Sequence, residues 1–246
     1  MIKHPITHYS QPTNYSCSPT SLAMLLSFFG KAYTPENIIE NIPIETDNEG
    51  KELGTITQHL ATWCIAKGFE VTMYSADFQI IDLSWISTEK EQLLGNLLSV
   101  LEHRNIPSLG KDHSRAYVQS YISFLENGGK LEIIPYMTTK LIDSILTDSP
   151  LFLTLNEAIL NKEGRKIDTG LRQSRHDDKD GILVNHSVVL FGKNDNENYL
   201  LADPWRESEN GFREIEPEHL LAAMAGAQMQ CDNLLFQLKP KEEKTI

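Results

Sequence analysis

The sequence predicts an α+β fold, with a helical N-terminal lobe followed by a lobe built on a small antiparallel β-sheet. Patterns of helical period dominate residues 1–148, whereas apolar stretches that predict strands gather after residue 149. Two of these late strands are joined by a turn-rich connection, which favours an antiparallel pair. Because helices come first and strands last, the pattern does not predict a doubly wound α/β fold.

The first predicted helix covers residues 17–29. Ser16 or Ser18 can cap its start. Pro19 suits its first turn, and Gly30 ends it. Its large apolar residues recur at helical spacing: Leu22, Leu25, Leu26 and Phe29. We therefore expect this helix to be buried along one face.

The other helices of the first half are predicted from apolar residues at helical spacing, some with a threonine cap or a terminal glycine. Their spans are 34–42, 54–68, 90–103, 116–126 and 138–146. The alternating residues 69–74 predict a strand, and residues 131–135 predict a short extended piece.

The second half of the chain contains four predicted strands and one predicted helix. The strands span 150–155, 182–191, 199–203 and 233–238, and the helix spans 217–229. Residues 157–181 are polar and predict a loop or hairpin excursion next to the histidine-bearing strand. Its charged residues include Arg165, Arg172, Arg175, Asp177, Asp178 and Asp180.

We expect residues 1–246 to form a single catalytic domain with a sizeable core. Its helical lobe would cover about 1–148 and carry an insertion at about 77–130. The β lobe would cover about 149–238, and the charged tail 239–246 is expected to be frayed. Because loops often carry function, the insertion and the polar excursion are the segments expected to select substrates or partners.

The composition argues against several classes of protein. The net charge of -12 argues against binding nucleic-acid phosphates. An acidic balance also suits a basic peptide substrate, although most acidic proteins are merely soluble. No stretch reaches the ~20 apolar residues of a membrane span, and the N-terminus lacks the apolar core of a secretory signal. We therefore expect a cytoplasmic protein, with export by a route without a cleaved signal left open.

The three cysteines are widely spaced and fit a reducing compartment rather than a disulfide framework. No CxxC, CxxH or HExxH motif is present, so neither a metal nor a cofactor is expected. Free cysteines are usually small buried apolar residues, and Cys64 and Cys231 are predicted to be structural in this way. Cys17 differs because it begins a helix, where free N–H groups and the helix dipole lower the pKa of a thiol.

Three further residues complete a set for thiol chemistry. His186 begins a strand-like stretch and is the candidate general base for Cys17. Asp203 closes the next strand and can orient the imidazole. Gln11 lies six residues before Cys17 and can donate its amide N–H to an oxyanion, with the Cys17 backbone N–H as second donor. Asn185 is a weaker orienter, because strand alternation turns it away from His186.

The segments around these residues, 11–26, 186–192 and 199–204, resemble the peptidase C39-like group of papain-fold proteins. That group is related to the double-glycine leader peptidases of bacteriocin exporters. The resemblance implies a papain-like cysteine peptidase fold. It also implies one role for each member of the set: a nucleophile (Cys17), a base (His186), an orienter (Asp203) and an oxyanion donor (Gln11).

The chain departs from the leader peptidases in two ways. It has Ser16-Cys17-Ser18 where they usually have Asp-Cys-Gly. The transmembrane and ATPase parts of the exporters are absent, so a stand-alone bacterial protein is expected.

The predicted function is cleavage of a peptide or amide bond through an acyl-thioester on Cys17, by a cysteine peptidase or amidohydrolase. Two alternatives stay open: an acyl or peptidyl transferase of the same fold, and a non-catalytic peptide-binding module. The expected partner is a peptide or small amide, with no nucleic acid and no membrane span. The sequence does not specify the substrate or the oligomeric state.

Overall fold

The computed structural model contains one large sheet flanked by helices. The structure describes residues 1–246 except 47–49, 51, 104–110, 171–172, 206–210 and 242–246. The strands, in chain order, are β1 (Ile2–Lys3), β2 (Glu45–Thr46), β3 (Glu52–Gly54), β4 (Phe69–Ser75), β5 (Lys130–Ile133), β6 (Leu151–Asn156), β7 (Lys166–Gly170), β8 (Gln173–His176), β9 (Asn185–Lys193), β10 (Tyr199–Ala202), β11 (Phe212–Ile215) and β12 (Leu234–Pro240). The helices are α1 (Cys17–Phe28), α2 (Pro35–Ile39), α3 (Thr57–Ala66), α4 (Lys90–His103), α5 (Lys111–Glu126), α6 (Thr139–Leu146), α7 (Glu157–Asn161) and α8 (Pro217–Gly226), with short 3-10 turns η1 (Leu83–Trp85) and η3 (Ala227–Gln230).

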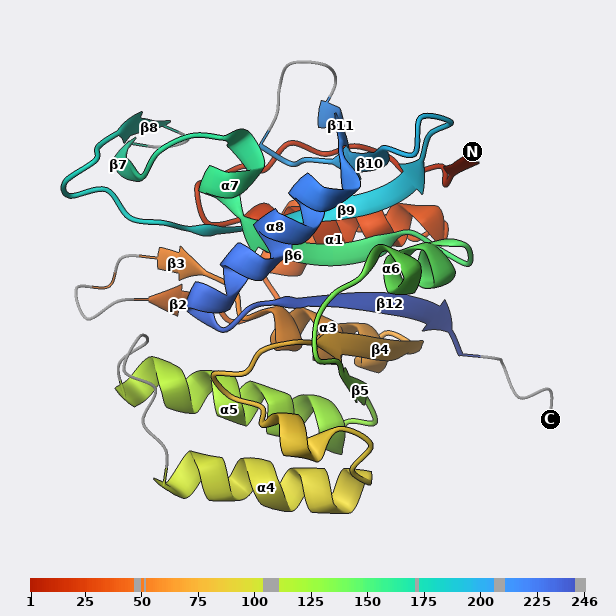
Figure 1. Ribbon diagram of the computed structural model, residues 1–246, viewed down its shortest axis with the longest axis vertical. Helices are drawn as coiled ribbons and strands as arrows, with labels where there is room; N and C mark the ends of the chain where they lie inside the picture. Colours follow the sequence, from red (N-terminus) through yellow and green to blue (C-terminus); the bar gives the residue numbers. More distant parts are fainter. Residues whose placement is uncertain (47–49, 51, 104–110, 171–172, 206–210, 242–246) are drawn as a thin grey trace.

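Within the described part of the chain, eight strands form the main sheet, in the order β11-β10-β9-β6-β12-β4-β5 with β1 paired to β9 (Figure 1). Neighbouring strands are antiparallel except β4 and β5, which are parallel. Two further pairs, β2 with β3 and β7 with β8, form separate hairpins. The histidine-bearing strand β9 lies in the interior of the sheet, between β10 and β6.

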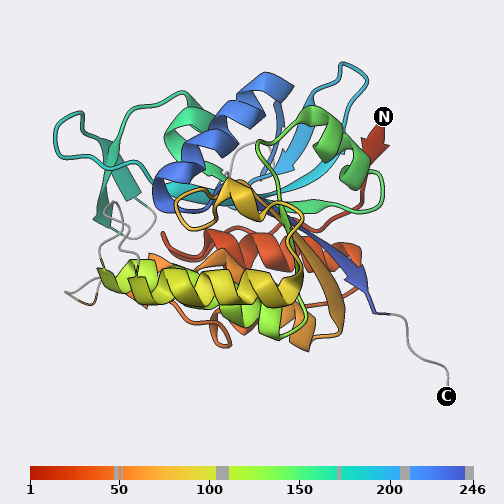
Figure 2. The ribbon, with the colours of Figure 1, turned by 60° about the horizontal axis from the view of Figure 1, so that its bottom comes forward.

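Helices cover both faces of the sheet, and Figure 2 shows α1 and α8 on opposite sides of it. The side chains of β9 divide between two cores accordingly. Val189 and Phe191 join the core that contains α1, whereas Val188 and Leu190 join the core that contains α6 and α8. A strand buried on both faces has a continuous apolar run rather than an alternating one, as β9 does.

The first helix begins at Cys17, as predicted, but it is not buried along one face only. Every residue from Ser18 to Leu26 is buried. The reason is that α1 lies between the sheet, where it packs on β9 and β6, and the helices α2 and α3. Ser16 precedes the helix without capping it, because its hydroxyl bonds with Thr13 instead.

The other helices of the first half are confirmed where local signals were strong. Thr34 forms a capping box at the start of α2, and the Thr138 hydroxyl accepts the Leu141 N–H at the start of α6. The bounds of α4 are those predicted. α5 begins at Lys111, earlier than the predicted residue 116.

The prediction of a small sheet confined to the second lobe is wrong. β4 and β5 belong to the predicted helical lobe, yet both are part of the main sheet. β4 pairs with the C-terminal β12 along its whole length, from Phe69 opposite Pro240 to Ser75 opposite Leu234. A strand with a buried apolar face and unpaired backbone groups needs a neighbour, and β12 supplies one. The division of residues 1–246 into one domain with the predicted lobes stays a prediction.

The segment 77–130, expected to be an insertion, packs into the same core as α1. Leu93 and Leu97 of α4 and Ile122 of α5 are members of that core. Tyr121 is fully buried, and its hydroxyl lies 3.0 Å from the Ser75 hydroxyl of β4. The two helices therefore belong to the packed body of the molecule.

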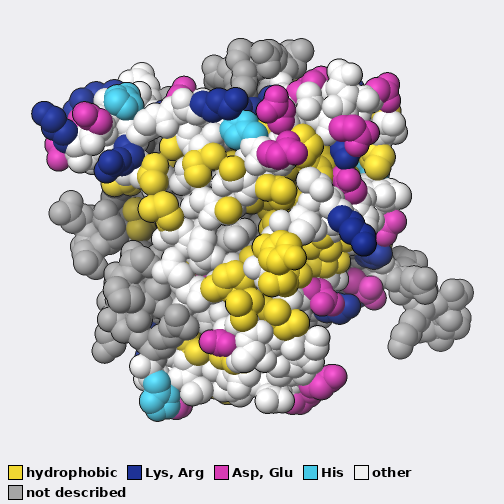
Figure 3. All heavy atoms as spheres, in the orientation of Figure 1, with side chains coloured by type: hydrophobic (Ala, Val, Ile, Leu, Met, Phe, Trp, Pro, Cys, Tyr) yellow, Lys and Arg dark blue, Asp and Glu magenta, His cyan; other side chains and the backbone are white. Residues whose placement is uncertain are grey.

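The polar excursion 157–181 contains the predicted hairpin, formed by β7 and β8, and also the short helix α7 that was not predicted. Asn156 caps α7 by accepting the Ile159 N–H. The hairpin surface carries both basic and acidic side chains, at the upper left of Figure 3. Arg172 of the excursion and residues 242–246 of the tail predicted to be frayed lie outside the described residues.

The predicted helix 217–229 is shorter than expected, because α8 ends at Gly226 and continues as the 3-10 turn η3. Cys231 then adopts a left-handed conformation, with φ of 54°, and turns the chain into β12. Among the described helices, α8 included, none is long and apolar enough to cross a bilayer.

Candidate active site

Cys17 is the first residue of α1, and it is partly exposed although both of its neighbours are buried. The first N–H groups of a helix have no partner within the helix, so this end carries a partial positive charge. The predicted setting of the thiol is confirmed by this position. A thiolate is favoured at such a helix end, and here it can reach the surface.

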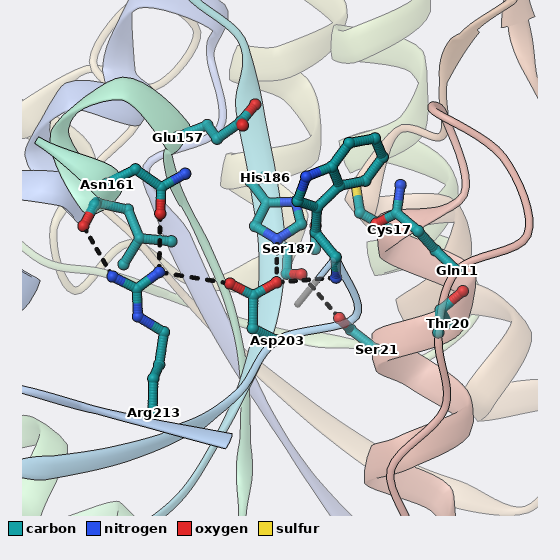
Figure 4. A network of polar contacts seen from close by, with 12 residues as sticks. Gln11, Cys17, Thr20, Ser21, Glu157, Asn161, His186, Ser187, Asp203 and Arg213 are labelled. Atoms are coloured by element: carbon teal, nitrogen blue, oxygen red, sulfur yellow. Dashed lines mark hydrogen bonds and ion pairs between the residues drawn. The ribbon is translucent and has the colours of Figure 1, made fainter. Parts of the chain in front are cut away.

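Two serines of α1 hold the helix against the strand that carries His186. Ser21 Oγ donates to the Ser187 carbonyl at 2.8 Å (Figure 4). Ser18 Oγ lies 2.8 Å from Ser187 Oγ. Because Ser18 follows Cys17 and Ser187 follows His186, these bonds position the thiol relative to the imidazole. Ser18 Oγ also lies 3.8 Å from Cys17 Sγ, within hydrogen-bonding range for sulfur. The serine that stands in place of the usual glycine thus contacts the thiol.

His186 and Asp203 form a close buried pair. His186 Nε2 lies 2.8 Å from Asp203 Oδ1, and the two residues are only 7% and 2% exposed. The backbone N–H of Trp205 donates to the same carboxylate oxygen at 2.9 Å. An ionised carboxylate only accepts, so His186 Nε2 carries the proton in this bond. The other ring nitrogen is then available to Cys17, whose thiol interacts with the imidazole.

Arg213 of β11 extends this chain beyond Asp203. Its Nη1 lies 3.5 Å from Asp203 Oδ2 and donates to Asn161 Oδ1 at 2.8 Å (Figure 4). Its Nη2 donates to the Leu160 carbonyl at 3.0 Å. The planar guanidinium, anchored by α7, is thereby held against the second carboxylate oxygen of Asp203.

The pKa values of the three groups follow from these contacts. Burial raises the pKa of the Cys17 thiol, but the hydrogen bond and positive charge of His186 outweigh it, so the net pKa is lowered. Burial opposes the charged form of His186, but the Asp203 carboxylate and Cys17 raise the imidazole pKa well above its ordinary value. Burial likewise raises the pKa of Asp203, and the His186 charge overcomes it and lowers the pKa to about 2. These directions favour a thiolate–imidazolium pair.

Gln11 lies on the same cleft as Cys17 and His186, and it is only 1% exposed. Its Nε2 donates one hydrogen to the Thr13 carbonyl at 2.7 Å, and an amide nitrogen carries a second. Its Oε1 is buried without a hydrogen-bond partner among the described residues. The backbone N–H of Gln11 donates to the Pro204 carbonyl at 3.0 Å, which ties this loop to the segment of the candidate orienter.

Asn185, the weaker candidate orienter, is engaged elsewhere. Its Nδ2 donates to the Ala227 carbonyl at 3.0 Å, and its backbone N–H donates to Gln230 Oε1 at 2.9 Å. Both partners belong to η3. The imidazole of His186 therefore has Asp203 rather than Asn185 as its carboxylate or amide partner.

The cleft above the thiol has a volume of about 330 Å³. Cys17, His186 and Trp205 line it, together with Lys166 and Ser174 of the β7–β8 hairpin. The polar excursion thus forms part of the wall of the cleft. A cavity of this size beside a partly exposed thiol can accommodate a side chain and part of a peptide backbone.

The remaining cysteines are as predicted. Cys64 and Cys231 are fully buried, and burial raises the pKa of the Cys64 thiol far above its ordinary value. In the described residues, no group of histidine, cysteine and carboxylate side chains is arranged to hold a metal ion.

Several residues of the site were not predicted. His8 Nε2 donates to the backbone carbonyl of Asp203 at 2.9 Å. Ser18 and Ser21 could have been noticed as polar residues on one side of an otherwise apolar helix. Arg213 carried no local signal, because its role depends on the pairing of β11 with β10.

Comparison with known proteins gives three findings. A profile of the Peptidase_C39 like family matches residues 3–225, a range that contains all the predicted site residues. Among solved structures, a C39-like peptidase candidate from Bacillus anthracis is similar with 13% identity and a TM-score of 0.48, over 98% of each chain. No curated protein matches the chain.

Proposed function

The chain belongs to the Peptidase_C39 like family, and on this basis we propose that it is a cysteine peptidase or amidohydrolase that acts through an acyl-thioester on Cys17. The observation that carries the proposal is the continuous chain from Cys17 through His186 to Asp203, with the thiol at the start of α1. A peptide or small amide would bind in the cleft that these residues line.

In the first step, the Cys17 thiolate attacks the carbonyl carbon of the substrate and a C–S bond forms. The carbonyl electrons move to the oxygen, which becomes an oxyanion. When the intermediate collapses, the C–N bond breaks and the His186 imidazolium donates its proton to the leaving amine. The products of this step are a free amine and an acyl-thioester on Cys17.

In the second step, His186 removes a proton from a water molecule, which attacks the thioester carbonyl. The C–S bond breaks, the carboxylic acid leaves, and the Cys17 thiolate and protonated His186 are restored. Asp203 stabilises the imidazolium in both steps because its carboxylate accepts the Nε2–H bond.

Gln11 is proposed to stabilise the oxyanion with the hydrogen of Nε2 that Thr13 does not take. The Cys17 backbone N–H, at the first position of α1, is the proposed second donor. The bond from the Gln11 backbone to Pro204 supports this role, since it holds the glutamine loop against the segment that carries Asp203.

The first test is labelling of the folded protein with iodoacetamide across pH, followed at each cysteine by mass spectrometry. Cys64 and Cys231 serve as internal controls because both are buried. We expect selective labelling of Cys17 with an apparent pKa below the ~8.5 of a free thiol, and loss of this shift in His186→Ala. Equal and slow labelling of all three cysteines would contradict the proposal and favour a non-catalytic peptide-binding module.

The second test is incubation with a diverse peptide mixture, in which new termini are identified by mass spectrometry. We expect cleavage by the wild-type chain and none by Cys17→Ala. Cleavage that persists in Cys17→Ala would show that Cys17 is not the nucleophile.

A further inference from the structure

A second cavity, of about 300 Å³, adjoins Cys17 and shares Asn185 and Val184 with the cleft. Glu45 of β2 and Asp232, between η3 and β12, are its charged lining residues. Within the described part of the chain, neither a lysine nor an arginine lines it. The cavity therefore has an acidic character beside the proposed nucleophile.

Three lining residues have a side-chain oxygen that is buried and lacks a hydrogen-bond partner in the described structure. These atoms are Asp232 Oδ1, Asn185 Oδ1 and Thr55 Oγ1. Asn185 donates one amide hydrogen to the Ala227 carbonyl, and its Oδ1 can accept a hydrogen bond. Buried polar atoms are nearly always paired, and a donor that enters the cavity would pair these.

Asp232 is the most unusual of these groups. It is only 8% exposed, and among the described residues no lysine or arginine forms an ion pair with it. Burial raises its pKa well above the ordinary value; a hydrogen bond with Thr57 opposes this rise, and the negative charges of Asp77 and the Cys17 thiolate add to it. A cation in the cavity would offset both effects, since it would supply a counter-charge as well as hydrogen-bond donors.

We propose that this cavity is a substrate subsite that receives a basic side chain, with the guanidinium of arginine as the best-fitting group. A guanidinium carries five N–H donors and no acceptor, which matches a cavity whose unpaired atoms are all oxygens. Its positive charge matches Glu45, and a guanidinium beside Asp232 would favour the ionised form of that carboxyl. The substrate class is thus a peptide with a basic residue close to the bond that Cys17 attacks. This inference rests on the proposed function, because it assumes that Cys17 is the nucleophile.

The test uses two peptidyl chloromethyl ketones that are identical except for arginine or citrulline, placed in turn at the first and second residues before the electrophile. Citrulline has nearly the same shape as arginine but no charge. We expect the arginine probe to label Cys17 at least tenfold faster in one of these positions. In Asp232→Asn, the ratio of the labelling rate of the arginine probe to that of the citrulline probe should fall toward one. It should persist in Asp148→Asn, which alters an exposed carboxylate that pairs with Lys239 at the far end of β12.

Equal rates for the two probes, or no reaction of either, would overturn the subsite if iodoacetamide still labels Cys17 selectively. The proposed nucleophile would then stand without the subsite. A preference for arginine that is unchanged in Asp232→Asn would also overturn it. Loss of selective iodoacetamide labelling would instead overturn the proposed function, and the subsite with it.

Discussion

Two buried aspartates close to Cys17 have pKa values that are shifted in opposite directions. Asp203 and Asp232 are 2% and 8% exposed, and burial raises the pKa of both carboxyls. For Asp203 this effect is overcome by His186, the Trp205 N–H and Arg213, and the pKa falls to about 2. Asp232 instead faces the negative charges of Asp77 and Cys17, and its pKa rises. The comparison teaches that partners, rather than burial, decide the charge of a buried carboxyl.

The largest expected effect comes from removing His186, the imidazolium partner that lowers the pKa of Asp203. His186→Ala removes the proposed base and leaves Asp203 without its imidazolium. We expect turnover of a cleaved peptide to fall by at least about 10³-fold. The fold should be retained by circular dichroism. His103→Ala, an exposed histidine of α4, is the control and should keep its activity. Activity near that of the wild type in His186→Ala would refute the site.

Asp203→Asn tests the paired member of the comparison. Loss of a charge-assisted hydrogen bond to the imidazolium, about 1.5–3 kcal/mol, predicts a decrease in turnover of about 10- to 100-fold.

The same variant makes a prediction about stability. The folded pKa of about 2 lies below the ordinary value, so ionised Asp203 stabilises the fold above about pH 4. This contribution is lost as the pH falls from about 4 through the folded pKa. Asp203→Asn should therefore lower the free energy of unfolding at pH 7 by about 2 kcal/mol, measured by urea denaturation. A variant as stable as the wild type at pH 7 would show that the pair does not stabilise the fold.

Asp232→Asn tests the unpaired member, and its effect on stability should have the opposite sign. A raised folded pKa favours the neutral carboxyl, so its stabilising contribution is complete below about pH 4 and is lost as the pH rises toward the folded pKa. We expect the variant to raise the free energy of unfolding at pH 7 by about 1 kcal/mol, with the gain vanishing near pH 3. Thermal unfolding across pH measures this difference. A destabilised variant at pH 7 would mean that Asp232 has a cationic partner.

The smallest effect is expected from Arg213→Gln, which removes a cation 3.5 Å from Asp203 but leaves His186 in place. Turnover should decrease about threefold. The alkaline limb of the pH profile for turnover should move to higher pH, because removal of a nearby cation makes the positive charge on the His186 imidazole more favourable. Arg175→Gln in the hairpin, where Arg175 pairs with Asp177, is the matched control. An unchanged pH profile in Arg213→Gln would show that Arg213 does not affect the charge of His186.

Much of the local structure could be predicted from the sequence. The cap at Thr34, the cap at Thr138 and the bounds of α4 depend on residues within a few positions of each other. Helix starts and ends depend on such short-range hydrogen bonds. For the same reason Cys17 was correctly placed at a helix start. The residues proposed for chemistry were recognised by their types and their order along the chain, and their roles stay predictions.

The residues around the proposed chemistry could not be predicted in this way. The bond between Ser21 and Ser187 joins residues 166 positions apart, and the ion pair of Arg213 with Asp203 requires β11 to lie beside β10. Asp232 had no distinctive neighbours in the sequence. Only its burial near Asp77 and Cys17 makes it unusual.

By itself, the sequence determined most of the helices and strands, the position of Cys17 at the start of α1, and membership of a peptidase-like family. Only the tertiary structure decided that β4 joins β12 in one large sheet, that α1 is buried on all sides, and that Asp203 lies beside cationic groups whereas Asp232 lies beside anionic ones. The physical reason is the distance along the sequence over which each interaction acts. Capping and periodicity act over a few residues, whereas strand pairing, burial and charge neighbours depend on segments that meet only when the whole chain folds.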